Sequence, residues 1–373
     1  MEMPSIVFDS AAVDQPWSAT YSAGQAPIVG ERANAIETLQ AIEKQAASRR
    51  FAGFLNYDLG GCFETLPTRA TDDLSLPFVY FLPCTRRPAG APIRAADMQI
   101  AKAGRPVANF TRAQYESAVE KCLAYISAGD VFQINLSQRF AVPWAGDASQ
   151  LYARLQNTFS ARYGAYLDTG DCQIISNSPE QFIRVHELPD GRRRIVNRPI
   201  KGTRPFEPGM LDNLEQSEKD KAELAMIVDL QRNDLGRICD IGTVKVTDRR
   251  SLEVHPTVIH GVATIEGILR PEVTLVDILR ATFPCGSVTG CPKIRAMQII
   301  DELEPVRRGV YCGAIGWIQG REMEFAVAIR TMTIKNGTVY IPVGGGIVAD
   351  SNPAAEYGET LVKARAMFSA LGV

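Results

Sequence analysis

The sequence lacks the features that define several large classes of protein. No run approaches the roughly 18 consecutive apolar residues of a membrane-spanning helix, so we expect no membrane span. Residues 1–10 hold no basic segment followed by an apolar run, so we expect no secretory signal. The net charge is only −2, which gives no reason to expect nucleic acid or an anionic membrane as a partner.

Metal-binding cysteine and histidine patterns are also missing. The chain has 8 cysteines and 3 histidines, and no two cysteines form a Cys-x-x-Cys pair, so a zinc site is not expected. Scattered cysteines are typical of a reduced, cytoplasmic protein. Core material is plentiful, because 46% of the 373 residues are hydrophobic. This is enough for two ordinary domains or one large unit of helices and strands.

Hydrophobic patterning predicts helices and antiparallel strands in alternating blocks. Helical spacing is found at 111–129, 213–235, 292–303 and 353–371. Strands are expected at 131–142 and 309–349, with a tight hairpin at Asn336-Gly337. This order favours an α+β fold over a doubly wound parallel sheet. Residues 83–108 are typical of a connection, so we expect a short N-terminal region and linker at 1–105, packed on a catalytic domain at 106–373.

The segment Pro-Ile-Lys-Gly-Thr at 199–203 is the most informative local feature. Lys201 lies between Arg198 and Arg204, and like charges together with burial disfavour the ammonium form. This lysine is therefore expected to be partly neutral and nucleophilic. Gly202 leaves room for a substrate to approach the backbone. The competing interpretation is a solvated basic loop, which is the commoner origin of such clusters.

Two predicted helices each carry acidic residues at i and i+3. The pairs are Asp220 with Glu223 and Glu356 with Glu359, and this spacing places both carboxylates on one helix face. Four such oxygen ligands across a cleft suit Mg²⁺. Ordinary i, i+4 ion pairs with Lys219 and Lys363 are the alternative, and each pair taken alone is better explained that way.

Five further features are candidates for ligand contact. Gly344, Gly345 and Gly346 would expose backbone N–H groups between a strand and a helix N-terminus, or serve as a bend. Arg330 closes an apolar strand and would grip a carboxylate or form a structural ion pair. His260 is either functional or a satisfied core histidine. Ser287 would donate to a ligand or cap the next helix, and Glu180 is a candidate acid or base, or a surface carboxylate.

Together these segments resemble the chorismate-utilising enzymes, a family that includes anthranilate synthase component I, aminodeoxychorismate synthase component I, and isochorismate and salicylate synthases. The resemblance is carried by SPEQF at 178–182, PIKGT at 199–203, KAELAMIVDLQRNDLGR at 221–237, VIHGVAT at 258–264, CGSVTGCPKIRAMQIIDELEP at 285–305 and GGGIVADSNPAAEYGET at 344–360. It implies the α+β fold of anthranilate synthase component I, with two large, mainly antiparallel sheets packed in a sandwich and helices on the outside.

Two positions distinguish the branches of this family. The branch that adds water to chorismate has a lysine base where this chain has Gln133, which cannot deprotonate water. Anthranilate synthases have alanine where this chain has Lys201. Lysine at position 201 together with glutamine at position 133 resembles the aminodeoxychorismate synthase pattern. Gln181, in place of the usual arginine, and Cys291, in place of the usual alanine, depart from the family.

The resemblance also implies a mechanism. Lys201 would add to C2 of chorismate as the C4 hydroxyl leaves with help from the general acid Glu180, and ammonia would then attack C4 to give 4-amino-4-deoxychorismate. Thr203 and His260 would orient the reacting groups. Mg²⁺ would be held by Glu223 and Glu359, with Asp220 and Glu356 in support. The substrate carboxylates would be held by Ser287, Tyr311, Arg330, Lys363 and the backbone of Gly344, Gly345 and Gly346.

Ammonia must be supplied from elsewhere, because the chain has no recognisable glutaminase Cys–His–Glu set. A separate glutamine amidotransferase subunit is therefore implied. The alternatives are anthranilate synthase component I and a catalytically silent chorismate-binding subunit. The segment that binds tryptophan in anthranilate synthases is not found, so feedback by tryptophan is not expected.

Overall fold

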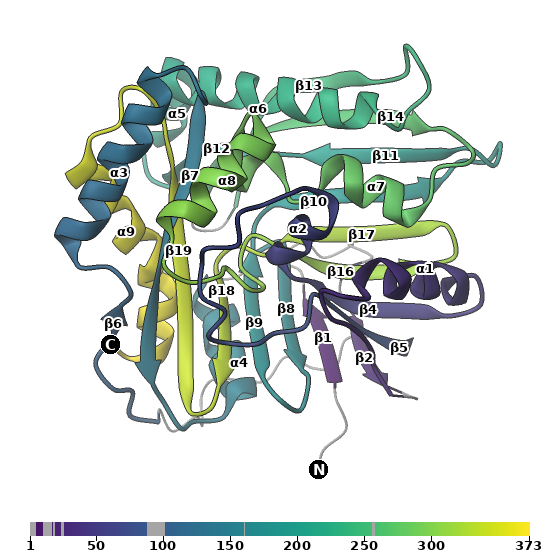
Figure 1. Ribbon diagram of the computed structural model, residues 1–373, viewed down its shortest axis with the longest axis horizontal. Coiled ribbons are helices and arrows are strands. Elements are labelled where there is room, and N and C mark those ends of the chain that lie inside the picture. Colours follow the sequence, from purple (N-terminus) through teal and green to yellow (C-terminus); the bar gives the residue numbers. More distant parts are fainter. Residues whose placement is uncertain are drawn as a thin grey trace.

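The strands form two large antiparallel sheets packed in a sandwich, with helices on the outside, which confirms the α+β fold class (Figure 1). The structure is a computed structural model that describes residues 5–9, 17, 19–23, 26–87, 101–159, 161–255 and 258–373. Residues 88–100 of the expected connection lie outside these described residues.

The first sheet carries the motif at 199–203. Its strands are β3 (Ile28–Gly30), β4 (Arg50–Leu55), β5 (Val79–Arg87), β10 (Gln181–Glu187), β11 (Arg193–Arg198), β12 (Ile200–Pro205), β13 (Lys245–Val254), β14 (Val258–Leu269), β16 (Ala314–Gln319) and β17 (Glu322–Val327). They pair in the order β13-β14-β11-β10-β17-β16-β4-β5, and β12 and β3 join β14 and β5.

The second sheet carries the three glycines at 344–346. Its strands are β1 (Ser5–Asp9), β6 (Val107–Ala108), β7 (Gln133–Pro143), β8 (Tyr163–Asp168), β9 (Gln173–Ser178), β15 (Gly290–Cys291), β18 (Thr331–Lys335) and β19 (Thr338–Ile347). They pair in the order β1-β8-β9-β18-β19-β7, with β6 and β15 on β7. Strand β2 (Ala19–Ala23) pairs with both β1 and β5, so the two sheets share one continuous ladder.

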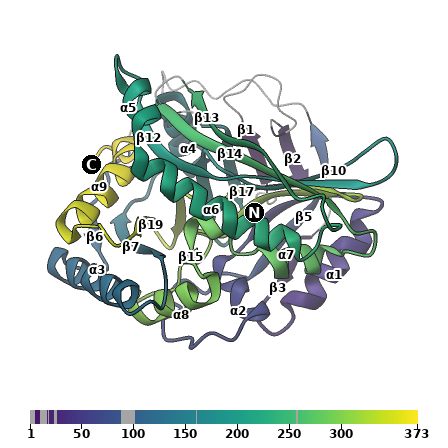
Figure 2. The same ribbon diagram turned by 90° about the horizontal axis from the view of Figure 1, so that it is seen from above.

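The helices cover the outer faces of both sheets, as Figures 1 and 2 show. They are α1 (Ala35–Ala46), α2 (Gly60–Phe63), α3 (Arg112–Ser127), α4 (Ala148–Phe159), α5 (Met210–Gln216), α6 (Glu218–Gly236), α7 (Leu275–Thr282), α8 (Lys293–Leu303) and α9 (Pro353–Leu371). Helices α1, α6 and α7 pack on the first sheet, α4 and α9 pack on the second, and α3 and α8 enclose one end of β7. Phe8, Phe54 and Trp317 belong to the core between the sheets.

Local signals placed several boundaries correctly. Thr111 begins α3 with a capping box, in which its hydroxyl accepts from the Gln114 N–H and the Gln114 side chain accepts from the Thr111 N–H. Asn352 caps α9, with a proline at the start of the helix. Asn336 and Gly337 both have positive φ, at 51° and 72°, and join β18 to β19 as expected for a tight hairpin.

Three sequence-based expectations were wrong. The helix expected at 213–235 is interrupted at Ser217, whose extended backbone ends α5 and whose side chain accepts from the Asp220 N–H to begin α6. The glycines at 344–346 lie inside β19, well before α9 begins, rather than between a strand and a helix. Arg330 lies beyond the end of β17, in the connection to β18.

No helix among the described residues combines the length and the apolar character needed to cross a membrane.

Candidate functional site

The two sheets meet at Lys201, where glycine makes room for functional side chains. A Cβ atom added to Gly346 on β19 would lie 3.0 Å from Gln133 Nε2 and 3.6 Å from Lys201 Nζ. A Cβ added to the neighbouring Gly345 would lie 3.2 Å from Glu356 Oε2 and 3.6 Å from Glu359 Oε1. The glycines are therefore needed for close approach of these groups to the strand, and they bring β7, β12, β19 and α9 together.

The ordinary ammonium form of Lys201 is disfavoured here, as expected; of the two expected causes, burial acts and the flanking arginines do not. Burial is the main cause that lowers its pKa, and the charge of Lys363 adds to the effect. Glu223, Glu180 and Glu359 act in the opposite direction. The residue as a whole is half-buried, although its ammonium group is buried. Lys201 thus combines a weakened hold on its proton with access for a substrate.

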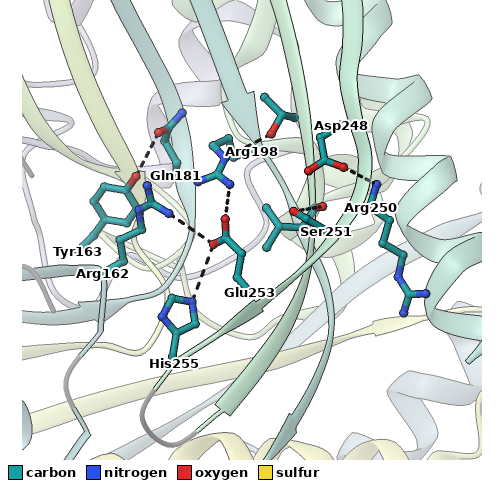
Figure 3. Close-up of polar contacts among 11 residues, drawn as sticks. Arg162, Tyr163, Gln181, Arg198, Asp248, Arg250, Ser251, Glu253 and His255 are labelled. Carbon is teal, nitrogen blue, oxygen red and sulfur yellow. Dashed lines mark hydrogen bonds and ion pairs between the residues drawn. The ribbon is translucent and has the colours of Figure 1, made fainter. Parts of the chain in front are cut away.

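The flanking arginines are neutralised by acidic partners and do not contribute to that shift. Arg198 forms an ion pair with Glu253, which also contacts Arg162 and His255 (Figure 3). Arg204 pairs with Asp220 at 2.9 Å between Nη2 and Oδ2. The expectation that these arginines lower the pKa of Lys201 was therefore wrong, because each positive charge faces a nearby carboxylate.

Gln181, the departure from the family pattern, is held in the same region by hydrogen bonds. The Tyr163 hydroxyl donates to its Oε1 at 3.1 Å (Figure 3), and its Nε2 donates to the Val196 carbonyl at 3.2 Å. Both ends of the amide therefore have partners, so the buried position tolerates glutamine in place of arginine.

Glu180 has the environment of a carboxylic acid that keeps its proton near neutrality. It lies between β9 and β10 and is only 3% exposed. Burial raises its pKa to about 7, against the effects of a hydrogen bond from Ser287 and the charge of Lys201. Its Oε1 atom is buried and has no hydrogen-bond partner. An acid of this kind suits proton donation to a leaving group, with one oxygen free for substrate.

Thr203 and His260 face each other across β12 and β14. They are paired in register, and Thr203 Oγ1 lies 2.9 Å from His260 Nδ1. Burial lowers the pKa of His260 to about 3, and Arg330 and His255 contribute in the same direction. The imidazole is therefore neutral at physiological pH and acts through hydrogen bonding rather than charge.

Arg330 and Tyr311 lie in the same part of the molecule and are largely buried. Arg330 has a left-handed backbone with φ of 49°, which is uncommon for a non-glycine residue. Burial lowers the pKa of Arg330 and raises that of Tyr311. Within the described part of the chain, no carboxylate forms an ion pair with Arg330. A guanidinium without a protein anion is suited to bind an anionic ligand.

The glycines of β19 offer backbone N–H groups, although from a strand edge. Gly344 pairs with Ser137 and Gly346 with Asn135. The N–H groups of Ser137 and Asn135 donate elsewhere, to Glu304 Oε1 and to the Thr289 carbonyl. These two pairs are therefore non-hydrogen-bonded, so the Gly344 and Gly346 N–H groups face away from β7. The Lys363 ammonium lies on that edge and donates to the Gly344 carbonyl at 2.8 Å.

The four candidate metal ligands are divided between α6 and α9. On α6, Asp220 pairs with Arg204 and Glu223 lies 3.8 Å from the Lys219 ammonium. On α9, Glu359 pairs with Lys363 at 2.7 Å. Among the described residues no group of three or more His, Cys, Asp or Glu side chains is arranged as a metal site.

One observation nevertheless fits a cation beside α9. Glu356 Oε2 is buried and lacks a hydrogen-bond partner, and burial raises the pKa of this carboxyl group, with Glu359 adding to the effect. Lys363 lowers the pKa of Glu359 although burial opposes this. Both carboxylates lie beside Gly345. Carboxylate oxygens with room for water and substrate are the ligands that Mg²⁺ prefers, so the donor set fits this ion.

Ser287 lies in a 3₁₀ turn, Gly286–Val288, and does not cap α8, which begins after Pro292. Its hydroxyl contacts the thiol of Cys285 and the Glu180 carboxyl group. Cys285 was not among the expected site residues, and the local pattern around it carries no signal for its role. Gln133 was expected only as a position that distinguishes the branches of the family, and it lies beside Lys201 at Gly346.

Comparison with known proteins shows the family of the chain. Residues 93–369 match the family described as chorismate binding enzyme. The chain is 43% identical over 291 residues to anthranilate synthase component 1 of Pseudomonas aeruginosa, covering 76% of this chain and 58% of that protein. It is 39% identical over 348 residues to aminodeoxychorismate synthase component 1 of Salmonella typhimurium, covering 83% and 74%. The chain thus spans little more than half of the Pseudomonas relative.

The fold is also found in solved structures. Anthranilate synthase component I from Streptococcus pneumoniae superposes with a TM-score of 0.83 at 29% identity, covering 96% of this chain and 94% of that one. MenF, the menaquinone-specific isochorismate synthase from Escherichia coli, gives a TM-score of 0.78 at 18% identity and shares the fold.

Proposed function

The chain belongs to the chorismate binding enzyme family, and we propose that it follows the aminodeoxychorismate branch. It replaces the C4 hydroxyl of chorismate by an amino group from ammonia, giving 4-amino-4-deoxychorismate for p-aminobenzoate and folate synthesis. The observation that carries the proposal is the placement of Lys201 beside Gln133 at Gly346. The amine supplies a nucleophile, and the neighbouring amide cannot act as a base for water.

Lys201 and Glu180 divide the work of the first step. The neutral amine of Lys201, made more available by its lowered pKa, forms a bond to C2 of the ring. The ring double bonds shift as the C4–O bond breaks, and Glu180 gives its proton to the departing hydroxyl, which leaves as water. Ammonia then forms a bond to C4, the double bonds shift back, and the Lys201–C2 bond breaks. The surplus proton of the incoming amine returns to Glu180.

Hydrogen-bond donors and positive charges on two sides of the site bind the carboxylates of the substrate. The Gly344 and Gly346 N–H groups and Lys363 provide donors along the β19 edge. Arg330 and Tyr311 provide the remaining donors, whereas the single hydroxyl proton of Ser287 is directed at Glu180. We infer that Glu223 and Glu359, with Asp220 and Glu356 beside them, hold Mg²⁺, which would neutralise the ring carboxylate. The orphaned oxygen of Glu356 supports this assignment.

A second subunit supplies the ammonia. Several relatives are named component 1, which implies a further component in those systems. We infer that a separate glutamine amidotransferase subunit is the partner here, and that the enzyme works in the cytoplasm. All 8 cysteines are free, as a reducing compartment requires.

The test is incubation of the purified chain with chorismate, Mg²⁺ and high ammonium, with products separated by chromatography. A product that an added lyase converts to p-aminobenzoate supports the proposal. Lys201→Ala is expected to abolish that product, while Lys121→Ala, which removes an exposed amine on α3, retains it. An absence of turnover under these conditions favours a silent chorismate-binding subunit.

Anthranilate synthase component I is the second candidate. The 43% identity to the Pseudomonas protein and the superposition on the Streptococcus structure favour it. Anthranilate as the product, together with full ammonia-dependent activity in Lys201→Ala, would select this reaction.

A further inference from the structure

A buried thiol lies directly behind the residues assigned to proton transfer. Cys285 is 2% exposed, and its Sγ atom lies 3.2 Å from Ser287 Oγ. On its other side, Gln231 Nε2 on α6 donates to the same sulfur at 3.5 Å. Burial raises the pKa of Cys285 to about 12, so the group is a thiol throughout the physiological range. Because the sulfur accepts from Gln231, its own proton is available for the Ser287 oxygen.

The hydroxyl of Ser287 in turn forms a hydrogen bond with the Glu180 carboxyl group. Its hydrogen bond lowers the pKa of the Glu180 carboxyl group, so the hydroxyl donates to the ionised form. The donors therefore run in one direction, from the Gln231 amide to the Cys285 thiol, to the Ser287 hydroxyl and to the Glu180 carboxylate. Each member of this chain is at most 5% exposed, so water does not compete for these bonds.

We propose that Cys285 is a positioning residue, whose thiol holds the Ser287 hydroxyl as a donor to Glu180 and so sets the pH range in which Glu180 serves as the acid. The proposal rests on the proposed function only in requiring that Glu180 donate a proton to the leaving group of chorismate. The competing explanation is that Cys285 merely fills space in the core beneath α6.

Few other charges act on Glu180, so the pH at which it titrates is a sensitive measure of this series of hydrogen bonds. Lys201 on β12 lowers its pKa, and the Ile200 backbone donates to it. Among the described residues, the thiols of Cys285 and Cys312 are the other titratable groups coupled to Glu180, and burial raises the pKa of both to about 12. These thiols stay neutral, so the Ser287 hydrogen bond and the Lys201 charge are the main effects that oppose burial.

The experiment compares the pH dependence of kcat in four variants, at saturating chorismate and ammonia so that ammonium titration is common to all. Ser287→Ala is expected to move the alkaline limb upward by about 0.5 pH unit or more, because a donor to the carboxylate is lost. Cys285→Ala is expected to move it in the same direction, and Cys285→Ser, which keeps a donor and an acceptor, to leave it near the wild-type position. The double variant Cys285→Ala/Ser287→Ala should move no further than Ser287→Ala alone.

A lower kcat or lower stability in Cys285→Ala with an unmoved limb would overturn the proposal in favour of simple packing. Additive shifts in the double variant would also overturn it. If Cys285→Ala does not fold, Gln231→Met removes the donor to the sulfur, and a smaller upward shift is expected. The assay follows whichever product the wild type forms, so anthranilate as the product would defeat the proposed function and still leave this proposal testable.

Discussion

Arg308 and Glu304 form a buried ion pair, and removing the arginine should destabilise the protein severely. Their side chains are 2% and 4% exposed, and two bonds of 2.9 and 2.6 Å join them. The Arg308 Nη1 group also donates to the Val288 carbonyl at 2.9 Å. In Arg308→Met the Glu304 carboxylate remains buried, and among the described residues only the Ser137 N–H still donates to it. Leaving one buried charge unpaired costs about 3–5 kcal/mol of unfolding free energy.

The assay is urea denaturation followed by fluorescence, with Arg307→Met as the matched control. Arg307 is the adjacent residue, and it pairs with Asp72 at 2.9 Å in a more exposed setting, with side chains 23% and 36% exposed. The same substitution there should cost only about 0–1 kcal/mol. A double variant, Arg308→Met/Glu304→Gln, should regain at least about 1 kcal/mol, because no unpaired charge is left in the core.

Equal losses in Arg308→Met and Arg307→Met would refute this reasoning, since burial would then have no influence on the value of the pair. A double variant less stable than Arg308→Met would refute it as well, because the unpaired carboxylate would not be the source of the loss.

Three further outcomes are expected. Gly202→Ala should destabilise the protein by about 1–3 kcal/mol more than Gly209→Ala. Both glycines have φ near 80°, but only a Cβ added at 202 would meet a neighbour, Leu214 at 2.7 Å. Urea denaturation of the two variants measures the difference, and equal losses would exclude the steric explanation. Glu180→Gln should lower kcat by about 10²- to 10⁴-fold, and since the wild-type carboxyl is protonated below its pKa of about 7 and ionised above it, a pH–rate profile should show an alkaline limb only in the wild type. Chelation should abolish turnover and Mg²⁺ restore it, and Glu359→Gln should raise the Mg²⁺ concentration for half activity by about tenfold or more; a titration of activity with Mg²⁺ that is unchanged in this variant would exclude Glu359 as a ligand.

Features fixed by neighbouring residues were predictable from the sequence. The cap at Thr111, the Asn352-Pro353 start of α9 and the Asn336-Gly337 hairpin each depend on groups within three residues of one another. The break at Ser217 was missed because serine is tolerated inside a helical pattern, and only its observed role as a cap reveals the interruption.

Features fixed across the fold were not predictable. Arg198 was expected to act on Lys201, but its charge is taken up by Glu253, which lies 55 positions later in the sequence. The glycines at 344–346 were expected between a strand and a helix, because their strand partner, β7, lies some two hundred positions earlier and is not visible in the local pattern. The thiol of Cys285 is likewise close to Glu180 only after both sheets have packed. Local pattern thus identified the chemical groups, and tertiary pairing decided their charge and orientation.

The proposed reactive centre draws its members from both halves of the sandwich. Lys201 and His260 belong to the first sheet, whereas Gln133 and Gly346 belong to the second. A substrate that binds along the β19 edge and is attacked by Lys201 on β12, as proposed, would contact both sheets at once. Occupancy at a hundred times the dissociation constant would add about 2.7 kcal/mol to stability. The gain would oppose separation of the two sheets in particular, because the proposed contacts lie between them rather than within either one.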